Sequence, residues 1–470
     1  MLAEIKGINE ECGVFAIWGH EKAAEMTYYG LHALQHRGQE GAGIVTTDGD
    51  KLNVHKGVGL INDVFSEGEV SRLKGHAAIG HVRYATQGGG GYENVQPLVF
   101  RSQKNSMALS HNGNLVNAHA LKNQLEAQGS ILQTTSDTEV IAHLVKRSGN
   151  VPMEEAITSA LGMIKGAYAF SILTEDQLFI GLDPRGLRPL SIGRLGDAYV
   201  VASETCAFDL IGATYEREVK PGELIVIDED GFRTKQFTSP LQRTLCSMEY
   251  VYFSRPDSDL NELNVHASRK TMGKQLAEES PVEADVVTGV PDSSISAAIG
   301  FSEATGIPYE LGLIKNRYVG RTFIQPSQEL REQGVKMKLS AVRGIVDGKR
   351  VVMVDDSIVR GTTSRRIVRL LKEAGATEVH VRIASPPIQN PCYYGIDTST
   401  KSELIASNNS IEDMKEIIGA DTLAFLTPDG LKKSIVSDRD TQEHGICRAC
   451  FTGNYPTEIY PDTEIPAYKD

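Results

Sequence analysis

The sequence VVMVDDSIVRGTTSRR, at residues 351–366, joins an apolar run directly to two acids and a loop of small polar side chains. The β-branched run at 351–354 predicts a buried strand of a parallel sheet. Asp355 and Asp356 then lie at the carboxyl end of that strand, where open α/β sheets bind their ligands. The residues that open the following helix are Arg360, Gly361, Thr362, Thr363 and Ser364.

This loop has the composition of an anion site. Backbone N–H groups and hydroxyls at the start of a helix bind phosphate, and the adjacent carboxylates suit ribose hydroxyls or a hard cation such as Mg²⁺. The segment has neither the Gly-Lys-Ser/Thr ending of a Walker loop nor the glycine pattern of a dinucleotide turn. The alternative is an ordinary strand–turn–helix in which Asp and Thr serve only as caps.

On the N-terminal side of this segment, the predicted pattern of strands and helices changes near residue 240. Residues 241–470 alternate strands with helices, which predicts a doubly wound parallel sheet. Residues 12–240 consist mainly of short β-branched runs bounded by turn residues, which predicts layered α and β structure with antiparallel sheets. One helix is expected to start at Ser136, because Glu139 three residues later completes a capping-box pattern.

Composition excludes several classes of protein. The 470 residues are 40% apolar and 23% charged, which is ordinary for a globular protein of two or three domains. A net charge of −13 argues against general binding to nucleic acid, and no apolar run approaches the roughly 18 residues that span a bilayer. Six cysteines without an export signal favour metal or catalytic use over disulfides, and a cytoplasmic protein is expected.

Cys12 follows a short leader, residues 1–11, that is too polar for an export signal and too short for a domain. Removal of this leader would place Cys12 at a new amino terminus. A thiolate is the competent nucleophile, and a free α-amino group, with a pKa of about 7.7–8.0, exchanges protons near neutral pH. By itself, a cysteine near a terminus is more often a small buried residue.

The 351–366 segment resembles the ribose-phosphate loop of the type I phosphoribosyltransferases, which bind phosphoribosyl pyrophosphate with Mg²⁺. The resemblance implies that Asp355 and Asp356 contact the ribose hydroxyls and that residues 360–364 hold the 5-phosphate. A second loop, TGVPDSS (288–294), resembles the pyrophosphate-side loop of that family, with Ser293 a contact to the magnesium along with the two aspartates.

Residues 315–343 reverse the charge of the chain locally, with seven basic residues against two acidic ones. Such a reversal suggests contact with a polyanion, although a solvated basic loop is the alternative. The family resemblance favours a flap that closes over the pyrophosphate and excludes water, with Lys315 among the residues that bind phosphoribosyl pyrophosphate.

Five segments of the first half closely resemble, in order, the glutaminase domain of class II amidotransferases, an N-terminal-nucleophile fold of αββα layers. The segments are CGVFAI (12–17), LQHRGQEGAGI (34–44), HVRYAT (81–86), HNGNLVN (111–117) and TSDTEV (135–140).

This second resemblance implies a role for each matched residue. Cys12 is the nucleophile, and the Asn112 side chain and the Gly113 N–H supply the oxyanion donors that acyl transfer needs. Arg83 holds the glutamine α-carboxylate and Asp137 its α-ammonium group. The glycines at 88–91 form either a loop over glutamine or a plain surface loop.

Four cysteines remain for a metal centre: Cys246, Cys392, Cys447 and Cys450. Four thiolates suit zinc or an iron–sulfur cluster, and their wide separation does not follow the paired spacing of a zinc ribbon. Their segments resemble the cluster-bearing branch of one family, in which such cysteines hold a 4Fe–4S cluster that fixes the C-terminal tail. Ordinary buried cysteines are the remaining alternative, and Cys206 is expected to be one.

Together the two halves resemble the glutamine phosphoribosylpyrophosphate amidotransferases, in the processed iron–sulfur form of Bacillus-like bacteria. The resemblance implies three regions: a propeptide at 1–11, a glutaminase domain at 12–240 and a phosphoribosyltransferase domain at 241–470. It also implies glutamine-dependent synthesis of 5-phosphoribosylamine, the first committed step of purine synthesis. A homotetramer, allosteric inhibition by purine nucleotides and an internal apolar passage for ammonia are expected with it.

Two other functions are compatible with parts of this pattern. A glucosamine-phosphate synthase would share the first half, but it would need sugar-isomerase modules in place of the 351–366 loop. A non-catalytic nucleotide-sensing regulator could use the second half, but it would have no use for a liberated Cys12 amine.

Overall fold

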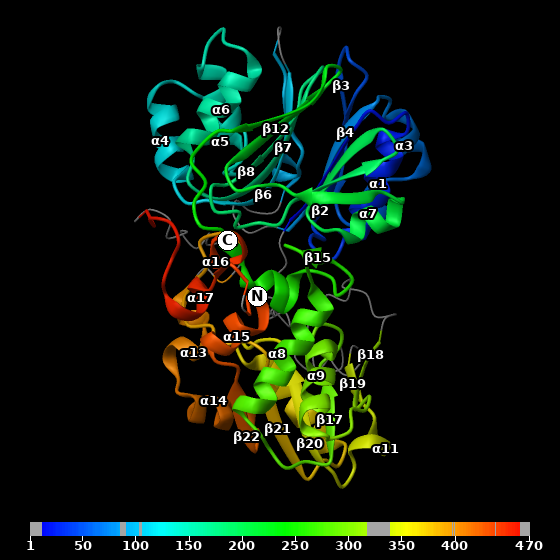
Figure 1. Ribbon diagram of the computed structural model, residues 1–470, viewed down its shortest axis with the longest axis vertical. Helices are drawn as coiled ribbons and strands as arrows, with labels where there is room; N and C mark the ends of the chain where they lie inside the picture. The colour runs from blue at the N-terminus through cyan, green and yellow to red at the C-terminus, as the bar shows by residue number, and fades with distance from the viewer. Residues whose placement is uncertain are drawn as a thin grey trace.

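The computed structural model describes residues 12–84, 91–102, 106–316, 339–396, 398, 400–437 and 439–460. The chain forms two halves stacked along the long axis, with blue-to-green elements in one half and green-to-red elements in the other (Figure 1). None of the helices in the described ranges combines the length and the apolarity needed to cross a membrane.

The first half contains two sheets that pack face to face. The seven-stranded sheet is antiparallel, and its strands in spatial order are β11 (Thr214–Glu218), β9 (Ser191–Leu195), β10 (Ala198–Ala202), β1 (Gly13–Trp18), β4 (Ala77–Arg83), β2 (Gly41–Thr47) and β3 (Leu52–Val58). The six-stranded sheet is also antiparallel, in the order β13 (Gly231–Gln236), β12 (Glu223–Asp228), β8 (Leu178–Leu182), β7 (Gly166–Leu173), β6 (Met107–Leu115) and β5 (Leu98–Phe100).

Helices cover the outer face of each sheet, so the layers run helix, sheet, sheet, helix (Figure 1). The helices and 3₁₀ turn of this half are α1 (Ala23–Ala33), α2 (Ile61–Val64), α3 (Glu67–Arg72), η1 (Tyr92–Asn94), α4 (Ala118–Ala127), α5 (Glu139–Arg147), α6 (Met153–Met163) and α7 (Cys206–Ile211). Alternate strand residues, including Ala16, Ile79 and Ala169, form the apolar core between the sheets. The predicted αββα sandwich is confirmed.

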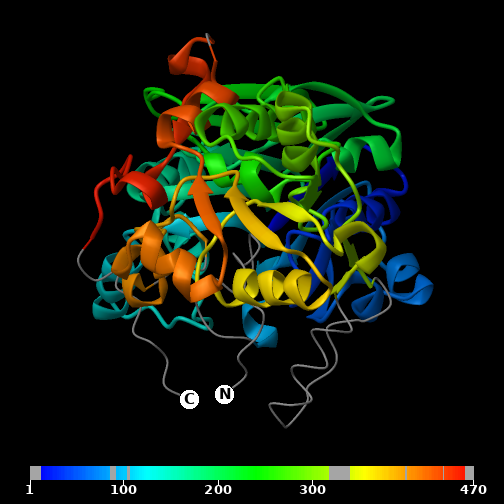
Figure 2. The same cartoon turned by 90° about the horizontal axis from the view of Figure 1, so that it is seen from below.

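The second half is built on a parallel sheet in the order β17 (Val286–Gly289), β20 (Arg350–Asp355), β21 (Glu378–Ile383) and β22 (Thr422–Phe425). Strands β17, β20 and β21 are buried on both faces. Val352 and Val354 pack with α8 (Val265–Glu279) and α9 (Ile295–Thr305), whereas Val351 and Met353 pack with α12 (Thr362–Glu373) and α14 (Ile411–Ile418). Figure 2 shows these helices on opposite sides of the sheet, which confirms the predicted doubly wound fold.

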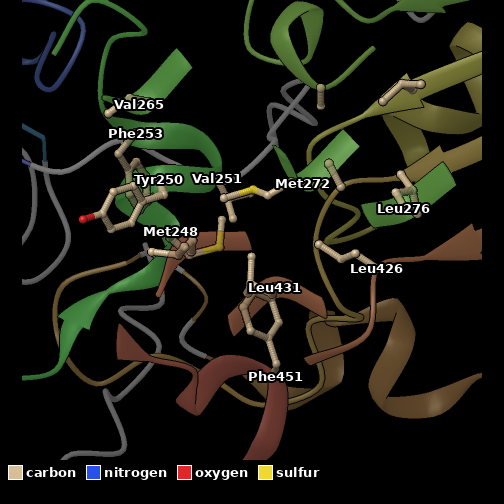
Figure 3. Close-up of a cluster of buried hydrophobic side chains, with 14 of the residues drawn as sticks. Met248, Tyr250, Val251, Phe253, Val265, Met272, Leu276, Leu426, Leu431 and Phe451 are labelled. Atoms are coloured by element: carbon tan, nitrogen blue, oxygen red, sulfur yellow. The ribbon is translucent and has the colours of Figure 1, made fainter. Parts of the chain in front are cut away.

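The end of the chain returns to the junction between the halves. β14 (Leu245–Cys246) pairs in parallel with β23 (Ile446–Cys447). In the close-up of Figure 3, Met248 and Tyr250 lie near Leu431 and Phe451 from the C-terminal part, within one apolar cluster. The remaining short elements are η2 (Glu249–Phe253, a π-helical turn), β15 (Asp259–Leu260), β16 (Leu263–Asn264), β18 (Leu313–Lys315), β19 (Leu339–Ala341), α11 (Arg343–Val346), η3 (Lys401–Glu403), α13 (Ile405–Asn408), α15 (Pro428–Ile435), α16 (Thr441–His444) and α17 (Ala449–Thr452).

Candidate active sites

The paired acids lie where the sequence predicts, at the carboxyl end of β20 beside the loop that follows β17. Ser294 Oγ donates to Asp355 Oδ1 at 3.0 Å, and Ser293 Oγ donates to Asp356 Oδ2. Ser357 Oγ donates to the other Asp356 oxygen at 2.6 Å. Two loops from neighbouring parallel strands therefore meet around two carboxyl groups.

Both carboxyl groups are buried, 7% and 8% exposed, without a directly bonded cation among the described residues. Burial raises the pKa of Asp355 well above its ordinary value, and the neighbouring Asp356 adds to the shift. Burial also raises the pKa of Asp356, although hydrogen bonds from serines and the charge of Arg269 oppose it. A divalent cation or ribose hydroxyls would satisfy such a pair.

The phosphate-loop residues extend from these acids into α12. Gly361 immediately precedes the helix, which begins at Thr362, and Ser364 is buried in its first turn. Arg360 is ion-paired with Glu403. The amide groups of residues 362–364 thus lie at the start of a twelve-residue helix, a location that favours an anion.

Lys315 lies at the end of β18, and its Nζ is 3.0 Å from Asp292 Oδ2 in the loop that carries Ser293. It therefore lies beside the loop whose serines bond the paired acids. The other predicted basic residues between 317 and 338 lie outside the described residues, as do residues 1–11 and 88–90.

The second predicted site is assembled at one end of the sheet sandwich. The β1–β4 register places Gly13 opposite Val82, so Cys12 reaches the end of β4, where Arg83 is 5% exposed. Cys12 Sγ donates to the Tyr84 carbonyl at 3.5 Å. His81 Nε2 lies 3.0 Å from the His111 carbonyl on the facing sheet, which brings the HVR and HNGN segments together.

Asn112 and Gly113 lie on β6 next to this crossing point. Asn112 is 1% exposed, and its Nδ2 has no hydrogen-bond partner among the described residues. Gly113 has φ +139°, and a Cβ there would lie 2.1 Å from the Ala167 carbonyl oxygen. A buried amide donor without an acceptor is costly, so this position is suited to an oxygen supplied by a ligand.

Asp137 is held beside the same strand. Its Oδ2 accepts from the Leu115 N–H at 2.9 Å and lies 3.8 Å from His111 Nδ1. Burial lowers the pKa of His111, and the charge of Asp137 opposes this shift. The predicted capping box is wrong: α5 begins at Glu139, and its carboxylate instead accepts from the Gln133 and Thr134 N–H groups.

Arg37 lies in the LQHRGQEGAGI segment (34–44), whose resemblance to the glutaminase family implied no role for it. Its Nε donates to the Cys12 carbonyl at 3.1 Å. Its other nitrogens donate to Glu204 and to both carboxylate oxygens of Glu249, at 2.6–2.9 Å. Arg37 and both carboxylates are fully buried, so this network joins the Cys12 segment to the second half.

Four predicted metal ligands line one cavity at the same junction: Cys246, Cys392, Cys447 and Cys450. Leu187 of the first half and Ile396 also line it. Burial raises the pKa of Cys447 to about 12, and it raises the pKa of Cys450 well above its ordinary value. Within the described ranges, no group of three or more His, Cys, Asp or Glu side chains is arranged to hold a metal ion.

Both halves match known protein families. Residues 81–209 match the glutamine amidotransferase domain, and residues 264–401 match the phosphoribosyl transferase domain. The chain is 70% identical over 471 residues to amidophosphoribosyltransferase of Bacillus subtilis (strain 168), covering 100% of this chain and 99% of the relative. The chain belongs to the amidophosphoribosyltransferase family.

Other amidophosphoribosyltransferases support the same conclusion. The Staphylococcus aureus (strain MRSA252) enzyme is 54% identical over 456 residues, covering 97% of this chain and 92% of the relative. A solved structure of the B. subtilis enzyme in complex with ADP and GMP superposes with a TM-score of 0.93 at 69% identity. It covers 97% of this chain and 100% of that one. A second structure, described as the allosteric regulatory enzyme of purine biosynthesis, has the same score and identity and covers 97% and 98%.

The chain is therefore a transferase of the amidophosphoribosyltransferase class, which performs the first step of purine biosynthesis. Residues 264–401 match a phosphoribosyl transferase domain, whereas a glucosamine-phosphate synthase would have sugar-isomerase modules in this part of the chain. This match excludes that alternative. The 70% identity to an amidophosphoribosyltransferase over the whole chain also excludes the hypothesis of a non-catalytic regulator.

Proposed function

We propose that Cys12, freed from residues 1–11, is the nucleophile that liberates ammonia from glutamine. Its thiolate attacks the side-chain amide carbon, the C–N bond breaks, and the leaving nitrogen takes a proton from the Cys12 α-ammonium group. Water then hydrolyses the thioester to glutamate. The observation that carries this proposal is the buried Asn112 Nδ2, which finds no partner in the part of the chain that the structure describes and lies next to the His81–His111 contact between the two sheets.

Asn112 Nδ2 and the Gly113 N–H would then stabilise the oxyanion of each tetrahedral intermediate. Donors that are already in place when charge develops contribute strongly, since no reorganisation is needed at that moment. Arg83 would bind the α-carboxylate of glutamine and Asp137 its α-ammonium group. Arg37 would hold the Cys12 carbonyl, and with it the orientation of the thiol.

At the second site, Asp355 and Asp356 would hold the ribose hydroxyls of phosphoribosyl pyrophosphate. Arg360, Gly361, Thr362, Thr363 and Ser364 would bind the 5-phosphate. Ammonia forms a C–N bond to the anomeric carbon as the C–O bond to pyrophosphate breaks, giving 5-phosphoribosylamine. Lys315 and the 288–294 loop would stabilise the departing pyrophosphate.

Mg²⁺ would be held at this site by Asp355, Asp356 and Ser293. The fit rests on two adjacent buried carboxyl groups that meet the hydroxyls of Ser293 and Ser294 from the neighbouring loop. Oxygen ligands of this kind suit Mg²⁺, which when bound neutralises charge on the pyrophosphate.

The four cysteines would hold one 4Fe–4S cluster. Four sulfur donors from three chain segments line one cavity of aliphatic character, and the β14–β23 register places Cys246 beside Cys447. The Tyr394 N–H donates to Cys392 Sγ at 3.4 Å, a contact typical around cluster sulfurs. The cluster would fix the C-terminal segment to the junction.

Further properties follow the relatives. The B. subtilis structure contains ADP and GMP, and we propose inhibition of this chain by purine nucleotides. A homotetramer, a cytoplasmic location, the domain limits 12–240 and 241–470 and an internal passage for ammonia stay predictions. Exogenous ammonia that competed fully with glutamine-derived nitrogen in an isotope experiment would argue against the passage.

The decisive experiment compares Cys12→Ser with Cys206→Ser, a buried thiol in the same half. Cys12→Ser is expected to abolish glutamine-dependent synthesis while ammonia-dependent synthesis continues, and Cys206→Ser is expected to preserve both. Intact mass of active wild-type protein should show loss of residues 1–11. Active protein that retains Met1, or loss of both activities in folded Cys12→Ser, would refute the proposal.

A further inference from the structure

Residues 392–396, which follow directly from one cysteine of the cavity, cross from the second half onto the strand that carries Asn112 and Gly113. This segment, called the strap below, contacts β6 and its neighbours through its backbone. Asn114 Nδ2 donates to the Tyr393 carbonyl at 2.9 Å. Arg188, fully buried in the first half, donates to the Tyr394 carbonyl.

Gly395 packs directly against the oxyanion strand. A Cβ built on it would lie 2.9 Å from Arg188 Nη2, 3.3 Å from the Gly113 carbonyl carbon and 3.4 Å from its oxygen. Gly395 also has φ +119°, a conformation that other residues rarely adopt. Both the space and the backbone conformation therefore require glycine where the strap meets Gly113.

The strap is also anchored to the cysteine cavity. Cys392 and Tyr394 line that cavity together with Leu187 of the first half, and the Cys246 N–H donates to the Leu187 carbonyl at 3.1 Å. Tyr394 belongs to a buried cluster with Val116 and Ala167. Val116 directly follows β6, and Ala167 lies on β7. The strap thus joins the cysteine cavity, through Cys392 and Tyr394, to the oxyanion strand, through Tyr393 and Gly395.

We propose that residues 392–396 position the Asn112–Gly113 donors, so that release of nitrogen from glutamine depends on an intact cysteine site in the second half. Gly395 and Asn114 are positioning residues in this account, because they act on the Asn112 and Gly113 donors through the backbone of β6. The inference rests on the proposed roles of Asn112 and Gly113. It adds that the four-cysteine site supports the glutaminase reaction specifically, beyond holding the tail.

The physical reason is the sensitivity of acyl transfer to donor placement. A displacement of about 1 Å at a reacting centre costs up to roughly 10²-fold in rate. The phosphoribosyl site is built from β17, β20 and α12, whereas Asn114 and Arg188 hold the carbonyls of Tyr393 and Tyr394 against the first half. A strap defect should therefore affect nitrogen release and spare nitrogen transfer.

The test uses the complete enzyme and Gly395→Ala, with Tyr394→Phe as the matched control in the same strap. Tyr394→Phe keeps the ring and removes only the hydroxyl, which bonds Thr457 at 2.9 Å, away from β6. Gly395→Ala is expected to lower kcat for glutamine hydrolysis by about 10- to 100-fold. Ammonia-dependent synthesis and iron content per subunit should stay at the wild-type level, and Tyr394→Phe should retain both activities.

A readout besides activity is amide hydrogen exchange in the peptide spanning 107–116. Exchange there should become faster in Gly395→Ala, and also in wild-type enzyme from which iron has been released by oxidation. Unchanged glutamine hydrolysis in Gly395→Ala, equal loss of both activities, or unchanged exchange after iron release would each overturn the inference.

If Gly395→Ala does not fold, Asn114→Ala replaces it, because this change removes only the bond to the Tyr393 carbonyl. A selective fall in glutamine hydrolysis supports the inference and an unchanged rate overturns it. Cys12→Ser assayed in parallel keeps the two proposals apart. Retention of glutamine-dependent synthesis in that variant would count against the role of Cys12, whatever the strap variants show.

Discussion

The two sites differ in how far along the chain their parts are gathered. The phosphoribosyl site takes its acids and its phosphate loop from one strand–loop–helix segment, and the neighbouring 288–294 loop and Lys315 adjoin it. The glutaminase site joins residues from β1, β4 and β6 of two facing sheets, and its supports include Glu249 and residues 392–396 of the other half. The phosphoribosyl site is therefore built mainly from one continuous segment, whereas the glutaminase site is supported by contacts at the junction between the two halves.

They also differ in electrostatics. The phosphoribosyl site concentrates two buried carboxyl groups whose pKa values are raised by burial. The glutaminase site presents the buried Asn112 amide, whose Nδ2 has no hydrogen-bond partner among the described residues and suits a developing negative charge. Changes at the junction should therefore weaken nitrogen release, whereas changes at the acids should stop synthesis from either nitrogen source.

The largest effect is expected from Glu249→Ala, which breaks the junction. This change leaves Arg37 buried without one of its two carboxylate partners, and Arg188, whose Nη1 lies 3.9 Å from Glu249, loses a neighbouring charge. Breaking a buried ion pair from one side costs about 3–5 kcal/mol in the free energy of unfolding. Denaturant titration measures it, and a cost no larger than that of an exposed pair would show that the junction is not held by this network.

Asn112→Ala sharpens the contrast within the glutaminase site. Loss of one oxyanion donor lowers kcat by about 10²–10³-fold, or roughly 2.7–4 kcal/mol. Steady-state assays with glutamine and with ammonia should show the loss only with glutamine. An equal fall with both nitrogen sources would mean that Asn112 acts on the whole fold.

Asp355→Asn tests the electrostatic side of the comparison. The folded pKa of Asp355 is raised above its unfolded value of about 3.9, so between these values the folded protein binds more protons than the unfolded one. Stability of the ligand-free enzyme should therefore fall as the pH rises through this range. The neutral asparagine should raise the free energy of unfolding at pH 7.5 by on the order of 1 kcal/mol.

The same variant should lose synthesis from glutamine and from ammonia alike, because both reactions use the phosphoribosyl site. Denaturant titrations at several pH values, together with the two assays, check both outcomes. A variant that is less stable than wild type at neutral pH would contradict the sign of the shift.

The smallest effect is expected at the partly exposed end of the phosphate loop. Glu403→Gln removes the partner of Arg360, and exposed ion pairs contribute only about 0.2–1 kcal/mol. Arg360 is then available to the substrate phosphate, so KM for phosphoribosyl pyrophosphate should fall slightly while stability barely changes. A raised KM would place Arg360 outside the phosphate site.

Sequence reasoning reached the local site more completely than the distributed one. The 351–366 segment shows strand, acids and helix start in succession, so its geometry could be predicted from the residues alone. The partners of Cys12 came only from resemblance, because β-sheet register between distant strands leaves no local signal. Arg37 and Glu249 are 212 positions apart, and nothing near either residue indicates the other.

Glu139 illustrates a different failure. A capping box is a local pattern, yet the buried carboxylate instead bonds the backbone of residues 133–134. Tertiary placement of the preceding loop prevailed over the local preference. Glu139 thereby holds the 133–134 backbone, which leads directly into Asp137. The residue that was assigned to a capping box therefore supports the loop that carries Asp137.

The pairing of β14 with β23 sets the order in which the molecule can be completed during synthesis. Leu245 and Cys246 emerge from the ribosome long before Ile446 and Cys447, their partners in the parallel ladder. The interface between the halves therefore closes only when translation is almost finished. If this interface supports the glutaminase reaction as proposed, a nascent chain gains its full rate of ammonia release only after the last paired segment has been made.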